Sequence, residues 1–114
     1  MILLAIHQGL LRPCFSEDIL EEYAGVLARP KFAFSPDDID GVLAMFLSQG
    51  ELFLPDVSAD TSSDPADTKF LHCAHAAQAD YLVTGNKRDF PQASYGLTRV
   101  VSAGQLLERI TFEI

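Results

Sequence analysis

The sequence predicts an α/β sandwich with a mostly parallel sheet. Apolar residues at helical spacing alternate along the chain with short apolar runs of strand length. Serines that can cap helices, prolines and glycines stand at the expected boundaries. Because strands and helices that alternate in this way are joined by right-handed crossovers, we expect the carboxyl ends of the strands to meet at one edge of the sheet.

Length and composition fit a single domain over residues 1–114. The chain is 48% hydrophobic and 21% charged, which is ordinary for a globular protein. No apolar run approaches the about 20 residues that span a bilayer, and no signal peptide is recognisable at the N-terminus. Cys14 and Cys73 lie in apolar contexts and are interpreted as reduced core thiols in preference to a disulfide. These observations predict a cytoplasmic protein.

The net charge of −8 limits the classes of partner. It disfavours broad, sequence-independent binding of nucleic acid through a basic face. It still allows a nuclease, because metal ions neutralise both the acids of a site and the phosphate of the substrate. An acidic surface also suits a basic partner protein.

Capping residues and apolar spacing place three helices and two strands in the first half of the chain. Ser16 and Ser35 precede acid-rich helix starts, and Pro30 and Gly50 follow helical patterns. The expected elements are the last turns of a helix at 1–9 with Gly9 as its C′ residue, a strand at 10–15, a helix at 17–28, a helix from Pro36 to Gly50 and a peripheral strand at 51–57.

The stretch from Ser63 to Phe90 organises the rest of the chain. Asp64 has the profile of a helix N-cap, Pro65 fits the first helical position, and Asp67 falls in the first turn. At about 100° per residue, Asp67 projects within the apolar face formed by Phe70, Leu71, Ala74 and Ala77. An acid on the inward side of a helix must be paired, protonated or bound to a metal.

A covered strand at 81–84 is expected to open into a polar loop at 85–89. In open parallel sheets, ligands sit at this end of the strands. After a loop at 91–96, a strand is expected at 97–101. Ser102 and Gln105 form a capping box for a final helix at 103–109.

Oxygen-bearing side chains from separate elements are therefore expected to converge at one edge of the sheet. Glu22 lies on the flank of its helix, whereas Glu21 points nearly opposite the apolar face. Asp67 opens the central helix, and Asn86 and Asp89 follow the central strand. Oxygen ligands with room for water and phosphate are what a hard divalent cation needs.

Three segments in order give the chain a resemblance to the PIN-domain nucleases, in particular to toxins of bacterial toxin–antitoxin pairs. They are SEDILEEYAGVLARPKF (16–32), DPADTKFLHCA (64–74) and ADYLVTGNKRDF (79–90), and the closing RVVSAGQLLE (99–108) also fits. The resemblance covers nearly the whole chain. It implies a PIN-like three-layer sandwich and an endoribonuclease that depends on Mg²⁺ or Mn²⁺, acts on RNA and pairs with an antitoxin protein.

The resemblance also implies roles for individual residues. Glu22 and Asp67 match catalytic acids that hold the metal. Asn86 stands where many members carry a further aspartate, Asp89 is a possible substitute, and Asp64 is a less favoured ligand that capping already explains. For substrate binding, the residues are Thr84, which orients phosphate or a metal ligand, and Lys87 and Arg88, which contact RNA or are simply solvated.

One part of the family pattern has no counterpart. Family members begin with a central strand that ends in an aspartate, and Met1 aligns inside the helix that follows it. We therefore expect a sheet with its first central strand missing and weak or no activity of this chain alone. Exposed strand edges and helix faces favour a homo-oligomer or a strand given by another chain.

Two alternatives remain. An inactive remnant would act only as a binding module for an antitoxin-like partner. A zinc site at His72, Cys73 and His75 is less favoured, because the spacing is short and no second ligand cluster supports it.

Overall fold

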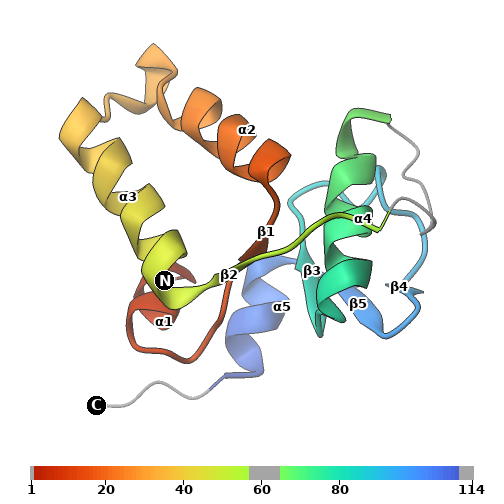
Figure 1. Ribbon diagram of the computed structural model, residues 1–114. Coiled ribbons are helices and arrows are strands. Elements are labelled where there is room, and N and C mark those ends of the chain that lie inside the picture. The colour runs from red at the N-terminus through yellow and green to blue at the C-terminus, as the bar shows by residue number, and fades with distance from the viewer. Residues whose placement is uncertain (1, 57–64, 111–114) are drawn as a thin grey trace.

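The computed structural model describes residues 2–56 and 65–110 (Figure 1). Helices and small sheets are mixed, as the α/β class requires. The elements are α1 (Ile2–His7), β1 (Cys14–Phe15), α2 (Glu17–Leu27), the 3₁₀ turn η1 (Pro30–Phe32), α3 (Pro36–Gln49), β2 (Glu51–Leu52), the 3₁₀ turn η2 (Pro65–Asp67), α4 (Thr68–Ala77), β3 (Tyr81–Val83), β4 (Ser94–Tyr95), β5 (Thr98–Val101) and α5 (Ala103–Glu108). None of the helices within these ranges is long and apolar enough to cross a membrane.

The predicted helix boundaries are largely confirmed by their capping contacts. Helix α1 ends in a Schellman motif: Gly9 has a φ of 77°, and the N–H of Leu10 donates to the carbonyl of Ala5 at 2.9 Å. The Ser16 hydroxyl accepts from the N–H of Ile19 at the start of α2. Reciprocal capping boxes open the other two helices, formed by Ser35 with Asp38 at α3 and by Ser102 with Gln105 at α5.

The central helix begins later than the sequence indicated. Residues from Pro65 to Asp67 form the tighter 3₁₀ turn, and α4 starts at Thr68. Asp67 therefore occupies the N-cap position of α4 and does not lie within its first turn, although its side chain makes no capping hydrogen bond there. The expected cap and ligand at Asp64 lie outside the described residues.

The strands form two separate sheets and not the single sheet that we expected. Strand β1 pairs in parallel with β2, while β5 pairs in parallel with β3 and antiparallel with β4. The first two strands are shorter than predicted, since only Cys14–Phe15 and Glu51–Leu52 pair. Strand β4 was not expected, because its two residues carry no alternating pattern.

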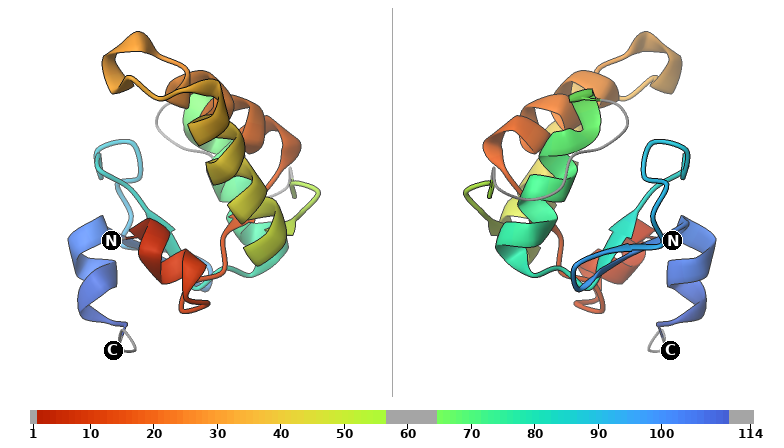
Figure 2. Two further views of the ribbon diagram at one scale, coloured as in Figure 1. Left: turned by 90° about the vertical axis from the view of Figure 1, so that its left-hand side faces the viewer. Right: turned by 90° about the vertical axis from the view of Figure 1, so that its right-hand side faces the viewer.

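Helix α4 joins the two halves of the fold. Its Leu71 belongs to one core cluster with Phe90, Tyr95 and Val100, and its Cys73 to another with Phe15 and Ile19. Phe70, which is only partly buried, packs against both clusters. On the opposite side of the three-stranded sheet lies α5 (Figure 2). The position of α4 therefore sets how the two sheets face each other.

Candidate functional site

A cavity of about 890 Å³ is bordered by the two sheets. Cys14 and Phe15 of β1 line it from one sheet, and residues 81–85 of β3 and its following turn line it from the other. Four acids from separate parts of the sequence also line it: Glu22, Asp67, Asp80 and Asp89. The cavity thus brings together most of the acids that the sequence assigned to a metal site.

Glu22 is held at the cavity by an ion pair between two helices. Its Oε1 lies 2.7 Å from Lys69 Nζ, and the two side chains are 35% and 27% exposed. Lys69 also lies over the ring of Phe70, with Nζ 5.8 Å from the ring centroid. Because Lys69 is in the first turn of α4, the pair keeps Glu22 near the helix start, where Asp67 stands. No pattern in the sequence predicts this role of Lys69, because the contact joins two helices that are distant in the chain.

The loop after β3 is shaped by its own polar side chains. Thr84 Oγ1 accepts from the N–H of Asn86 at 3.0 Å, and Asn86 Oδ1 accepts from the N–H of Arg88 at 3.1 Å. Asn86 Nδ2 donates to Asp89 Oδ2 at 3.2 Å. The amide oxygen proposed for a metal is therefore already engaged in the loop, and Asn86 is exposed. Thr84 and Asp89 line the cavity, whereas Asn86 is not among its lining residues.

The two basic residues of this loop lie outside the cavity lining as well. Lys87 Nζ donates to Gln105 Oε1 at 2.8 Å, and the same oxygen accepts from the N–H of Ser102 in the capping box. Lys87 therefore ties the loop to the start of α5. Arg88 is exposed.

No three His, Cys, Asp or Glu side chains within residues 2–56 and 65–110 lie close enough to hold a metal ion. Glu22, Asp67 and Asp89 share a cavity but do not form a closed cluster. The zinc alternative is not supported either, because Cys73 is buried in the core and His75 Nε2 lies 3.1 Å from Asp56 Oδ2. His72 Nε2 is buried and has no hydrogen-bond partner among the described residues.

Three side chains at the cavity stay protonated near neutral pH. Burial raises the pKa of the Cys73 thiol to about 11, with the charge of Cys14 as a smaller cause. Burial also raises the pKa of Cys14, and burial followed by the charge of Glu22 raises the pKa of Tyr23. Both cysteines are free. They are therefore poor nucleophiles, because the thiolate is the reactive form.

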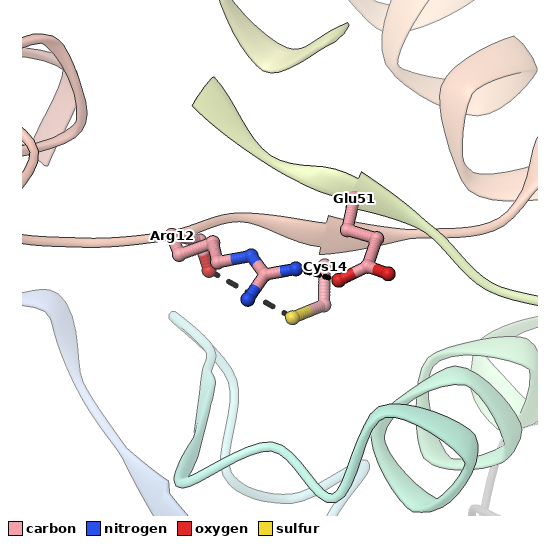
Figure 3. A network of polar contacts seen from close by, with 3 residues as sticks. All are labelled: Arg12, Cys14 and Glu51. Atoms are coloured by element: carbon pink, nitrogen blue, oxygen red, sulfur yellow. Dashed lines mark hydrogen bonds and ion pairs between the residues drawn. The ribbon is translucent and has the colours of Figure 1, made fainter. Parts of the chain in front are cut away.

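Strand β1 carries a small polar network at its start (Figure 3). The guanidinium of Arg12 forms an ion pair with the carboxylate of Glu51 on β2, and Cys14 Sγ lies 3.7 Å from the carbonyl oxygen of Arg12. The ion pair is exposed and contributes little stability. It links the two short strands at one end of the cavity.

The model of one family, described as PIN domain, matches residues 1–88. The chain belongs to the PIN-domain family. The match spans α1 through β3 and so includes Glu22, Asp67 and Thr84 of this PIN domain. The family is of nuclease type and generally depends on divalent metal ions. No curated protein and no solved structure matches the chain.

Proposed function

We propose that this PIN domain is a metal-dependent endoribonuclease of the toxin type, with weak or no activity of this chain alone. The observation that carries the proposal is that Glu22 and Asp67, 45 positions apart in the sequence, line the same cavity. Two free thiols support a reducing, cytoplasmic setting.

The donors fit a hard divalent cation by their chemistry. Carboxylate oxygens are the ligands that Mg²⁺ and Mn²⁺ prefer, and the ammonium of Lys69 already places a positive charge against Glu22. Glu22 and Asp67 would hold the ion, with Asp89 as a further oxygen donor. A bound ion supplies charge neutralisation at the phosphodiester and lowers the pKa of water.

Residues after β3 would position the RNA. Thr84 lines the cavity at the end of the strand and would orient a phosphate there. Lys87 and Arg88 are exposed on the loop beside it and would contact the RNA backbone. The protonated Tyr23 phenol borders the same cavity and adds no charge to it.

A measurement of Mn²⁺ binding tests this proposal. We expect calorimetry to show Mn²⁺ binding that Asp67→Asn weakens about tenfold or more, a cost of about 1.4 kcal/mol. Glu21→Gln is the matched control, since Glu21 is exposed on the same helix as Glu22. RNA cleavage with Mg²⁺ should stay near background. Vigorous cleavage lost in Asp67→Asn would contradict the impairment, and absence of Mn²⁺ binding would contradict the nuclease proposal.

A second candidate function is a binding module for an antitoxin-like partner. The separation of β1–β2 from β3–β5–β4 favours it, because a cavity that a partner could fill is lined by Cys14 of β1 and by residues 81–85 within and after β3. Co-purification with a small protein and no Mn²⁺ binding would support this function.

A homo-oligomer is the other form of association that we propose, because the exposed side chains of Leu54 and Leu97 offer apolar surface for it. Light scattering of the purified chain tests it.

A further inference from the structure

We propose that the tip of the α2–α3 hairpin, residues 29–34, is a contact site for single-stranded RNA, with a base stacked on Phe34 and phosphates held by Arg29 and Lys31. None of the residues of this hairpin tip lines the cavity. The inference rests on the proposed function, because it assigns a place for the part of the RNA that extends beyond the acids.

Two phenylalanine rings are stacked on each other at the hairpin tip and remain in contact with water. The ring centroids of Phe32 and Phe34 lie 6.1 Å apart with an interplanar angle of 19°, and the two residues are 42% and 46% exposed. Lys31 Nζ lies 5.1 Å from the ring centroid of Phe32. Phe32 thus contacts a cation and a ring, whereas Phe34 stands at the end of the stack. Because every base has a π face, an exposed ring in this position can take a base as the next layer.

The backbone of the hairpin tip sets this arrangement without a ligand. The N–H of Phe32 donates to the carbonyl of Arg29, and the N–H of Ala33 donates to that of Pro30, both at 3.1 Å. Ala33 then adopts the left-handed conformation with a φ of 52°, which is uncommon for a residue that has a β-carbon. The capping box of Ser35 opens α3 directly afterwards. A turn held in this way loses little conformational freedom when a ligand binds.

The charge of the hairpin tip is opposite to that of the whole chain. Residues 28–36 include Arg29 and Lys31 and no acid, although the chain has a net charge of −8. Both cations are exposed, and neither forms an ion pair with another residue that the structure describes. The next acids are Asp37 and Asp38, of which Asp38 is engaged in the capping box of α3. Cations beside exposed rings are the combination that holds single-stranded nucleic acids.

The hairpin tip suits a nucleic acid better than a protein surface. Phe32 and Phe34 are its only large exposed apolar side chains, and they offer far less area than the about 20–30 residues a side of a stable protein interface. Lysine is also depleted at the core of such interfaces. Phosphates, in contrast, are complementary to both cations.

The hairpin tip lies within reach of RNA that enters the cavity. Helix α2 carries Glu22 at the cavity and ends at Leu27, about 8 Å further along the helix axis. The turn η1 and the chain that follows β3 lie toward the same end of the molecule (Figure 2). One RNA strand can therefore contact both places, and a base bound at Phe34 would fix which nucleotide lies beside Glu22.

Fluorescence anisotropy of a labelled oligonucleotide, with EDTA present, tests the stacking. The probe is an oligoadenylate of about ten nucleotides, and its control has the same phosphates on abasic sugars. We expect the full chain to bind the adenylate about fivefold or more tightly than the abasic strand. Phe34→Ala should remove most of this preference, whereas Phe34→Tyr, which keeps the ring, should retain it. Circular dichroism checks that both variants are folded.

The salt dependence of adenylate binding tests the charges. Each phosphate contact to a single strand contributes about 0.7 to the slope of log affinity against log salt, so Lys31→Gln should reduce the slope by about that amount. Arg99→Gln is the matched control, since Arg99 is exposed on β5 and lies outside the hairpin tip. Its slope should equal that of the wild type.

Four results would overturn the proposal. They are no adenylate binding by the wild type, equal affinity for the adenylate and the abasic strand, equal adenylate binding by the wild type and Phe34→Ala, and equal changes of slope in Lys31→Gln and Arg99→Gln. A dimer that Phe34→Ala converts to a monomer, with RNA binding unchanged, would identify a second copy of the chain as the occupant and overturn the proposal too.

The result is independent of the metal assay, because EDTA removes divalent ions and the hairpin tip lies outside the cavity lining. Base-dependent binding that Phe34→Ala abolishes, without any Mn²⁺ binding, would support the RNA contact and refute the nuclease proposal. Mn²⁺ binding without base-dependent RNA binding would do the reverse.

Discussion

Lys69 Nζ lies 2.7 Å from Glu22 Oε1, so a cation from the start of α4 occupies a carboxylate that the family resemblance assigns to a metal. A divalent ion bound by Glu22 would have to compete with this ammonium. We therefore expect Lys69→Met to raise the affinity for Mn²⁺ about three- to tenfold, equivalent to about 0.7–1.4 kcal/mol. Titration calorimetry of the two proteins measures the difference.

The control for this prediction is Lys87→Met. It removes the same charge from the chain but from a side chain that binds Gln105 outside the cavity lining. Its Mn²⁺ affinity should stay within about twofold of the wild type. Equal gains in both variants would mean that net charge alone, and not the contact with Glu22, controls binding.

The buried thiol of Cys73 makes stability fall at alkaline pH. Burial raises its pKa from 9.0 to about 11, so the unfolded chain loses this proton at lower pH than the folded chain. The contribution is fully present below pH 9 and is lost as the pH rises through about 11, on the order of 3 kcal/mol in all. Urea unfolding at pH 8 and at pH 11 measures it. Cys73→Ala is the comparison, because Tyr23 titrates in both proteins; parallel pH profiles would exclude the role of Cys73.

Gly50 is required by the close approach of α3 to the segment before β1. A Cβ at this position would collide with the backbone oxygen of Pro13, the same oxygen that accepts from Glu51. We expect Gly50→Ala to lower the free energy of unfolding by about 1–3 kcal/mol, as overpacking does. Chemical denaturation provides the measurement.

The matched control is Gly41→Ala in the interior of α3. Nothing lies within 4 Å of a Cβ there, and alanine is the better helix former, so stability should rise by about 0.5–1 kcal/mol. Similar losses in both variants would show that the contact with Pro13 is not what distinguishes Gly50.

Local signals in the sequence were enough to predict the helices. The features that these signals did not predict depend on tertiary contacts. Ser16, Ser35 and Ser102 cap helices as expected, because a cap depends only on neighbours three residues away. The division into two sheets depends on which distant strands meet, and the pattern of Cys14–Phe15 cannot reveal its partner. The ion pair of Lys69 with Glu22 was not predicted for the same reason.

Two of the predicted site residues line one cavity, and their role there stays a prediction. Glu22 and Asp67 were identified from their place on helices and from family resemblance, and they do line one cavity. Asn86 was chosen by position after β3, yet hydrogen bonds within the loop engage both ends of its amide. Such short-range polar contacts compete with ligand binding and are not encoded in spacing alone.

Phe70 should be the side chain whose loss most weakens the connection between the two halves. It packs against both core clusters and lies 6.4 Å from the ring of Tyr23, while no strand ladder joins the sheets within the described residues. Because Phe70 is only partly buried, we expect Phe70→Ala to cost about 2–3 kcal/mol, below the range for a fully buried ring. Phe34→Ala is the control, since Phe34 is exposed and stacks only on Phe32 among the described ring pairs; its cost should stay below about 0.5 kcal/mol. If thermal unfolding showed equal losses, α4 would not be the element that holds the two sheets together.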